Sequence, residues 1–212
     1  MGKIKVLLDN GHGINTPGKR SPDAAKNITG SAFYLREYAW TREVAKICEG
    51  LLKMRGYDCE ILVPEEHDVP LATRASRVNA WCKKMGKDKM ILVSIHNNAA
   101  GDGSRWMSAR GWAAYTTKGV TKADYLAECL YSAAASVFHY PQKIRKYKDK
   151  YLERDWEENF YILTKTSCPA VLVENFFQDN RDDVKYLNSE NGKIECARVI
   201  VDGIDKYAKT YN

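Results

Sequence analysis

The stretch KVLLDNGHG, residues 5–13, joins a short apolar run to a turn that holds a histidine between two glycines. Two more apolar runs end in a polar group: MILVSI at 90–95 precedes His96, and AVLV at 170–173 precedes Glu174. If the three runs are parallel strands of one sheet, their ends share its carboxyl edge, where open α/β sheets bind ligands. We therefore predict that His12, His96 and Glu174 lie close together.

Short apolar runs alternate with longer segments of helical periodicity, which is typical of a parallel sheet covered by helices. We predict an α/β fold with a mostly parallel, twisted sheet flanked by helices on both faces, in a single domain over residues 1–212. The expected strands are 5–9, 57–63, 90–95, 111–116, 160–163 and 170–174. The expected helices are 37–54, 71–85, 122–138, 179–187 and 194–207.

Composition excludes few classes of function. The 212 residues contain 33 Lys and Arg against 27 Asp and Glu, a net charge of +6 that suits an acidic polymer as partner or solubility alone. No apolar stretch is long enough to cross a bilayer, so we expect no membrane insertion. A nucleic-acid partner is not expected either. The six cysteines form no C-x-x-C pair and are expected to be buried free thiols.

His12 and His96 are the histidines whose surroundings indicate a function. Gly11 and Gly13 let the backbone turn sharply and leave room around the His12 imidazole, although a surface position is the alternative. Asp9 is a potential partner for the second ring nitrogen of a ligand histidine. His96 stands at the mouth of a buried strand, where packing gives no reason for an imidazole.

Two glutamates accompany these histidines. Glu37 opens the first long helix, three residues before Trp40 and seven before Val44, so it falls on the core-facing stripe. An inward carboxylate needs a cation or a metal as partner, although the helix dipole alone also favours a carboxylate there. Glu174 ends a buried strand and is expected to have a perturbed pKa, as a general base should. A structural turn-capping role is its alternative.

Two histidines and one glutamate leave the fourth position of a tetrahedral zinc ion open to water, as in catalytic sites. Zinc lowers the pKa of that water and polarises a carbonyl, and Glu174 would take the proton and pass it to a leaving amine. The sequence therefore predicts one Zn²⁺ held by His12, Glu37 and His96, and hydrolysis of an amide or similar acyl bond. The two other histidines are not expected to be ligands: His67 is expected in solvent, and His139 is expected at the end of a helix, where a cation suits the helix dipole.

Several segments, in the right order, resemble the zinc-dependent N-acetylmuramoyl-L-alanine amidases, the family known as amidase type 3. They are the D-x-GHG turn at 9–13, Glu37 at the start of the next helix, an L-x-x-R-x-x-x-x-N helix with Leu71, Arg74 and Asn79, S-I-H-x-N-A at 94–99, N-F-Y-x-L at 159–163 and P-A-V-L-V-E at 169–174. Asn10 replaces the usual proline of the turn, and Glu43, on another helical face, competes with Glu37.

The resemblance implies that His12, Glu37 and His96 bind zinc and that Glu174 is the catalytic glutamate. It also implies peptidoglycan as partner and cleavage of the amide between N-acetylmuramic acid and L-alanine. The alternatives are a zinc peptidase or amidohydrolase that acts on another amide, and a non-catalytic cell-wall-binding module.

Further residues are candidates for contacts with substrate. Arg74 and Asn98 belong to the matching segments, and Arg110 is suited to the carboxylates of stem peptides. The basic run at 143–154 is a second candidate for those carboxylates, with a solvated face as its alternative. Aromatic side chains in or near the long loops are candidates for stacking on sugars or for ordinary packing; they are Trp106, Trp112, Tyr147, Tyr151 and Trp156.

The N-terminal residues lack the pattern of a signal peptide. We therefore expect synthesis in the cytoplasm and action on the cell wall after phage-type or other non-classical release, as for an endolysin or an autolysin.

Overall fold

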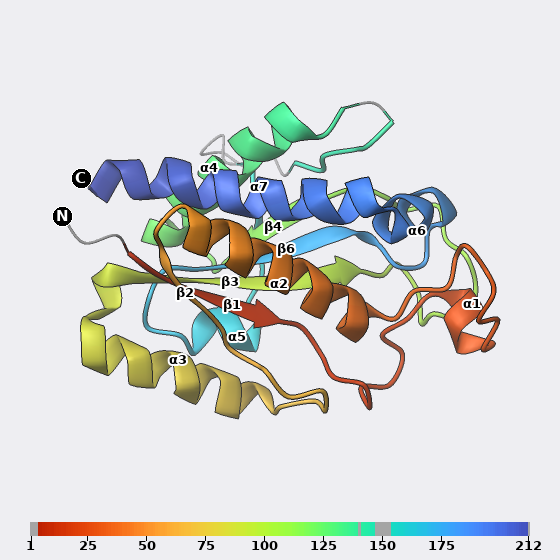
Figure 1. Cartoon of the computed structure of the whole chain (residues 1–212), viewed down its shortest axis with the longest axis horizontal. Helices are drawn as coiled ribbons and strands as arrows, with labels where there is room; N and C mark the ends of the chain where they lie inside the picture. Colours follow the sequence, from red (N-terminus) through yellow and green to blue (C-terminus); the bar gives the residue numbers. More distant parts are fainter. Residues whose placement is uncertain (1–3, 140, 147–153, 212) are drawn as a thin grey trace.

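The fold is a six-stranded sheet with helices on both faces (Figure 1). It is described by a computed structural model that covers residues 4–139, 141–146 and 154–211. The strands are β1 (Lys5–Asn10), β2 (Asp58–Ile61), β3 (Met90–Asn98), β4 (Ala113–Thr116), β5 (Trp156–Glu157) and β6 (Ala170–Phe177). The helices are α1 (Pro22–Ala25), α2 (Glu37–Met54), α3 (Leu71–Met85), α4 (Lys122–Val137), α5 (Tyr161–Thr164), α6 (Arg181–Asn188) and α7 (Glu190–Ala208), with short 3-10 turns η1 (Lys87–Lys89) and η2 (Lys209–Tyr211).

The strand order is β2-β1-β3-β6-β4-β5, and only the β4–β6 pairing is antiparallel. The predicted α/β architecture is therefore confirmed. The three strands β1, β3 and β6 are neighbours and run parallel, so their carboxyl ends share one edge of the sheet. The register aligns Asn10 with Ile95 and His96 with Glu174. This alignment brings the three polar strand ends together.

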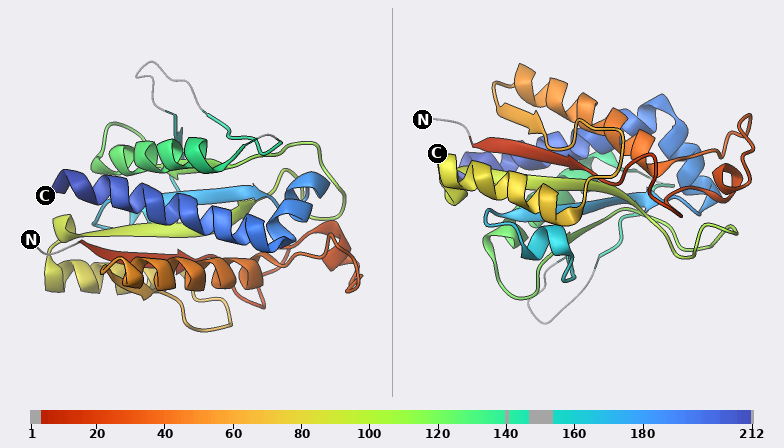
Figure 2. Two further views of the ribbon diagram at one scale, coloured as in Figure 1. Left: turned by 45° about the horizontal axis from the view of Figure 1, so that its top comes forward. Right: turned by 90° about the horizontal axis from the view of Figure 1, so that it is seen from below.

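Two helical layers cover the sheet because its central strands are apolar on both faces. Along β1, Val6 and Leu8 pack into one cluster with residues of α2, α4 and α7, while Leu7 packs into another with residues of α3 and α5. Figure 2 shows α4, α7 and α2 side by side over one face, with α3 and α5 on the other. The helices that bring Glu37 and Arg74 to the site therefore approach it from opposite sides of the sheet.

Residues 160–163 are not the strand that the apolar pattern predicted. They enter the helical turn α5, in which the N–H groups of Leu163 and Thr164 both donate to the carbonyl of Phe160. A strand would turn Ile162 and Leu163 to opposite faces, whereas the helical turn buries both in the same cluster. The edge strand is instead β5, which pairs with β4.

Side-chain caps set helix starts that periodicity placed only approximately. Asn180 accepts from the N–H of Asp183 and begins α6, and Ser189 accepts from the N–H of Gly192 and begins α7 four residues before the predicted start. Such caps satisfy N–H groups that lack a partner within the helix.

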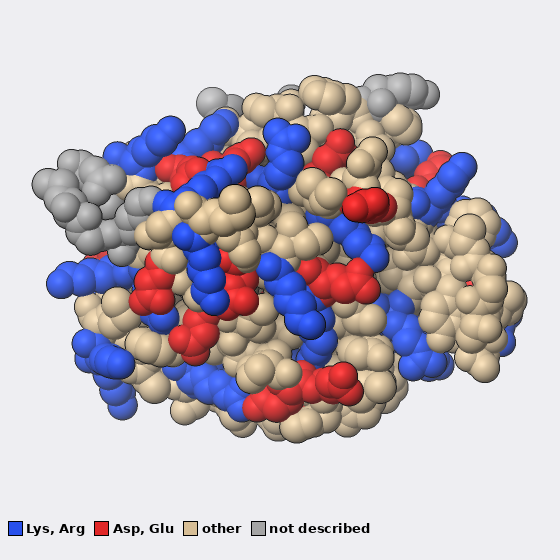
Figure 3. Space-filling view, in the orientation of Figure 1, with Lys and Arg blue, Asp and Glu red and all other residues tan. Residues whose placement is uncertain are grey.

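The structure also bears on the predictions about cysteines, membrane spans, charge and loop aromatics. All six cysteines are free and buried, as predicted. Among the described residues, no helix combines the length and the apolar character needed to cross a bilayer. Basic and acidic side chains are interspersed over the face that carries α2 and α7 (Figure 3). The predicted loop aromatics Tyr147 and Tyr151 lie outside the described residues.

The contact between α4 and α7 makes a prediction about stability. A Cβ built on Gly203 of α7 would lie 2.9 Å from the Cα of Leu130 in α4, so the two helices must separate to accept it. We expect Gly203→Ala to lower the free energy of unfolding by about 1–2 kcal/mol, because overpacking outweighs the gain in helix propensity. Chemical denaturation measures the change.

Gly50 of α2 is the matched control, because a Cβ there meets no atom within 4 Å. Gly50→Ala should raise the free energy of unfolding by about 0.5–1 kcal/mol. Equal effects of the two substitutions would contradict the close approach of α4 and α7.

Candidate metal centre and active site

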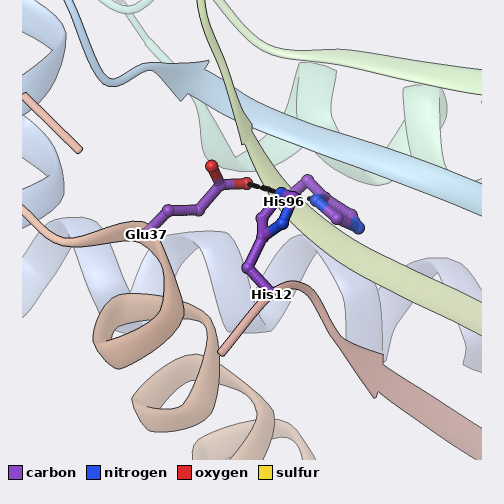
Figure 4. A group of neighbouring side chains, drawn as sticks. All are labelled: His12, Glu37 and His96. Carbon is purple, nitrogen blue, oxygen red and sulfur yellow. Dashed lines mark hydrogen bonds and ion pairs between the residues drawn. The ribbon is translucent and has the colours of Figure 1, made fainter. Parts of the chain in front are cut away.

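His12, Glu37 and His96 converge at the carboxyl edge of the sheet (Figure 4). Glu37 Oε1 lies 3.4 Å from His12 Nε2 and 3.1 Å from His96 Nδ1. The two imidazole centroids are 4.9 Å apart, with the rings nearly perpendicular. Within the described ranges, no other set of three or more His, Cys, Asp or Glu residues offers ligand atoms this close together.

The arrangement fits a zinc ion. Zinc holds nitrogen and oxygen ligands at about 2.0–2.1 Å, which puts neighbouring ligand atoms of a tetrahedron about 3.3 Å apart. The distances of 3.1 and 3.4 Å from the Glu37 carboxylate are close to that separation. Glu37 Oε2 is buried and has no hydrogen-bond partner among the described residues. The side chains of His12 and His96 remain 17% and 15% exposed, so solvent can reach this cluster.

Glu37 is held by its position at the first residue of α2. Its backbone N–H donates to the carbonyl of Lys19, and its Oε1 accepts the N–H of Asn97 at 3.0 Å. Burial disfavours the Glu37 carboxylate, but hydrogen bonds and charge from His12 and His96 outweigh burial and hold its pKa below the usual range. The carboxylate is therefore ionised and directed at the two imidazoles.

The same carboxylate affects the two histidines differently. Burial lowers the pKa of His12, despite the hydrogen bond with Glu37. Burial also disfavours charged His96, but there the hydrogen bond and charge of Glu37 are stronger and raise the pKa.

The glycines that flank His12 are required by close approaches. A Cβ on Gly11 would lie 2.3 Å from the His96 ring, and a Cβ on Gly13 would lie 2.0 Å from the backbone nitrogen of Asp68. Gly11 therefore leaves the space that the second imidazole occupies. The two glycines are therefore needed because neighbouring groups leave no room for a side chain, and not only because glycine lets the backbone turn.

His12 has a left-handed backbone conformation, with φ of 63°, which is uncommon for a residue with a Cβ. Two guanidinium groups from opposite faces of the sheet hold it there. Arg42 of α2 and Arg74 of α3 both donate to the His12 carbonyl, at 3.1 and 3.2 Å. Thr41 also donates to the carbonyl of Gly11 at 3.0 Å. Both long helices therefore fix the turn that presents the first imidazole.

Arg74 is buried beneath this turn. Its guanidinium lies 2.7 Å from Asp9 Oδ1 and 3.1 Å from Asp68 Oδ1, and it also donates to the carbonyls of Asn10 and Val69. Its side chain is only 2% exposed. The hypothesis that Arg74 contacts substrate is therefore replaced by a positioning role, because its donors are directed at the protein.

Asp9, the partner of Arg74, is buried as well and accepts the hydroxyl of Ser94 on β3. The pair thereby joins α3, β1 and β3 directly below the cluster. The expectation that Asp9 partners an imidazole is not met in the described part of the chain, where its side chain contacts Arg74 and Ser94.

Glu174 lies beside the cluster on β6, in register with His96 of the neighbouring strand. Its Oε2 is buried without a hydrogen-bond partner among the described residues. Burial raises the pKa of Glu174 to about 8; the charge of His96 opposes this rise and that of Glu37 adds to it. The expected perturbation is present, and its main cause is loss of solvent.

The other candidates have different surroundings. Asn98 ends β3 and approaches the Tyr115 hydroxyl at 3.5 Å, on the same edge as His96. Arg110 is paired with Asp182 and lies 3.4 Å from Asp183, so its charge is already neutralised by α6.

Some residues near the site carried no clear sequence signal. Arg42 is one of several arginines on the helices, and only the fold shows that it supports His12. Lys19 is half-buried in the loop before Glu37, and its charge acts on both His12 and Glu174. His67, by contrast, is exposed, as expected, and His139 is exposed as well.

Comparison with known proteins decides the family. The family profile for N-acetylmuramoyl-L-alanine amidase, amidase type 3, matches residues 6–206. The chain belongs to this amidase family. It is 27% identical to N-acetylmuramoyl-L-alanine amidase AmiC of Neisseria meningitidis, over 97% of this chain and 53% of that protein. It is 28% identical to the endolysin of Bacillus phage SPP1, over 94% of this chain and 64% of the endolysin. The chain thus spans about half to two thirds of these relatives.

Solved structures of amidases share the fold. An N-acetylmuramoyl-L-alanine amidase from Clostridium difficile superposes with a TM-score of 0.74 at 22% identity, and each chain is covered completely. AmiC2 of Nostoc punctiforme gives a TM-score of 0.75 at 23% identity, with 98% of each chain covered. The sheet and its two helical layers are therefore the amidase fold.

The close approach at Gly11 makes a prediction about metal binding by this chain. A methyl group there displaces the His96 imidazole, so we expect Gly11→Ala to weaken zinc binding at least about tenfold, as losses around metal ligands do. Isothermal titration with Zn²⁺ measures the affinity. Gly30→Ala is the control, because a Cβ at Gly30 meets no atom within 4 Å. Unchanged affinity in the Gly11 variant would contradict the proposed packing.

The buried pair of Arg74 and Asp9 makes a prediction about folding. Arg74→Met leaves the Asp9 carboxylate buried without its cation, which should cost about 3–5 kcal/mol of unfolding free energy. Arg77→Met is the matched control one turn along α3, because Arg77 pairs with Glu65 where both side chains are partly exposed. That loss should stay below about 1 kcal/mol. Denaturant unfolding of both variants distinguishes the two cases; equal losses would contradict the buried role of Arg74.

Proposed function

We propose that the chain is a zinc-dependent amidase that hydrolyses the amide between N-acetylmuramic acid and L-alanine in peptidoglycan. The observation that carries the proposal is the His12–Glu37–His96 cluster with the partly buried side chain of Glu174 beside it. Membership of the family and the names of the relatives support the choice of bond. We further propose that residues 1–212 form one catalytic domain and act at the cell wall.

Zinc is the ion that this donor set favours, since two imidazoles and a carboxylate are a common catalytic combination. His12 Nε2, His96 Nδ1 and a Glu37 carboxylate oxygen would hold it. When bound, the ion supplies a Lewis acid that polarises the scissile carbonyl and makes water easier to deprotonate. Asn97, whose N–H donates to Glu37 Oε1, keeps that carboxylate oriented toward the imidazoles.

Glu174 is proposed as the group that moves the proton. It stands in register with His96 on the adjacent strand, which puts it next to the cluster without making it a member. With a pKa of about 8, the Glu174 carboxyl is largely protonated at neutral pH, and the charge of a bound dication beside it would favour the ionised form. In that form its buried Oε2, which has no protein partner among the described residues, can accept the proton of the attacking water. The same oxygen then delivers the proton to the nitrogen that leaves as the amino group of L-alanine.

Two other functions remain to be distinguished by experiment. A zinc peptidase or other amidohydrolase would use the same residues on a different amide. A wall-binding module would keep the fold without turnover. Product analysis separates them, since the proposed reaction releases free L-alanine amino termini and creates no new reducing sugar ends.

The proposed roles predict a specific pattern of losses. Glu174→Gln should lower kcat on purified peptidoglycan at least about 100-fold, the scale of lost general base catalysis, while Zn²⁺ binding persists. His96→Ala and treatment with a chelator should abolish activity, and added Zn²⁺ should restore only the chelated wild type. Mass spectrometry of digested peptidoglycan and metal analysis give the two readouts.

Glu43→Gln is the matched control, because Glu43 lies on the same helix as Glu37 but pairs with Lys193 at the surface. It should retain activity and metal. Full turnover by the Glu174 variant would refute the assigned proton transfer, and wild-type protein that cleaves a different amide would refute the proposed substrate bond.

A further inference from the structure

A strip of aromatic side chains continues from Glu174 toward the edge of the sheet. Tyr115 of β4 lies beside Trp156 of β5 and Phe160, with ring centroids 6.2 and 5.5 Å apart. The Arg145 guanidinium lies 4.9 Å from the Trp156 ring centroid and 5.1 Å from that of Phe177. Arg145 is thus stacked on rings from β5 and from the end of β6.

The strip adjoins the proposed catalytic residues. Phe177 follows Glu174 by three residues on β6 and pairs in register with Asn98 of β3. Burial raises the pKa of the Tyr115 phenol, the charge of Glu174 raises it further, and the charge of Arg145 lowers it. Tyr115 thus lies within the electrostatic range of both Glu174 and Arg145. Three residues of backbone span at most about 10 Å. A short extended peptide is therefore long enough to reach from Glu174 to Phe177, where the strip begins.

Among the described residues, Arg145 differs from Arg110 and Arg154 in having no carboxylate partner. Arg110 is paired with Asp182, and Arg154 with Glu128. Within the described ranges, the Arg145 side chain has ring contacts but neither a hydrogen bond nor an ion pair. Stacking engages the flat face of a guanidinium and leaves its in-plane N–H groups available for a planar anion.

We propose that Arg145, stacked on Trp156 and Phe177, is a subsite that binds a carboxylate of the substrate's peptide, while the rings contact its apolar groups. This inference rests on the proposed amidase function and names the part of the substrate that sets specificity. Arg145 is a substrate-binding residue and takes no part in proton transfer.

The chemistry of the substrate supports this choice of ligand. A peptide that begins at the scissile amide and continues for two residues spans about 7 Å when extended. A carboxylate on its second residue can then reach a guanidinium beyond Phe177. A guanidinium recognises a carboxylate through paired, charge-assisted hydrogen bonds, which a neutral amide cannot match.

The test compares two synthetic probes, N-acetylmuramoyl-L-alanyl-D-glutamate and its diamide, in which both carboxylates are neutral. Wild-type enzyme loaded with zinc should favour the acid at least about tenfold in kcat/KM, the low end for charge-assisted hydrogen bonds. Arg145→Gln should reduce that preference to within about twofold, mainly through KM. Arg145→Lys should keep part of it.

Lys143→Gln is the matched control, since it removes the same charge from an exposed side chain two residues before Arg145 and should leave the preference unchanged. Binding of both probes to the Glu174→Gln variant, with and without Arg145→Gln, provides a readout that does not need turnover. The subsite is refuted if Arg145→Gln keeps the preference, or weakens acid and diamide equally. Absence of wild-type cleavage would instead refute the amidase proposal, while the binding preference would still decide the subsite.

Discussion

The site depends on one buried anion, the carboxylate of Glu37. A desolvated charge is costly unless donors or cations surround it. Here three groups from two other segments meet a single oxygen: the imidazoles of His12 and His96 and the N–H of Asn97. The start of α2, the turn after β1 and the end of β3 must therefore come together for the carboxylate to be stable. The same convergence creates a donor set for a metal.

Much of this arrangement could be predicted from local sequence. The apolar runs correctly predicted the central strands. Glu37 lies three residues before Trp40 and seven before Val44, and this spacing correctly predicted that its side chain is buried. The predicted bounds of α2 and α3 match the structure, because their stripes are regular. Placing His96 and Glu174 side by side followed from the rule that parallel strands end at one edge.

What could not be predicted depends on contacts between distant segments. Arg74 has the motif position of a functional residue, but its partners are Asp9, 65 residues away, and backbone carbonyls of a turn. Residues 160–163 have an apolar pattern that suits either a strand or a helical turn, and only the cluster beneath them decides. Arg145 stands in a basic run, where nothing local distinguishes it from its neighbours. Its rings come from β5 and β6.

Crystals of the protein grown with Zn²⁺ and measured at the zinc absorption edge locate the ion. We predict one anomalous peak within about 2.0–2.2 Å of His12 Nε2, His96 Nδ1 and a Glu37 oxygen, the usual zinc distances, with Glu174 outside the coordination sphere. A fully active protein whose zinc lies elsewhere, or whose Glu37 makes no contact with the ion, would contradict this structure of the site.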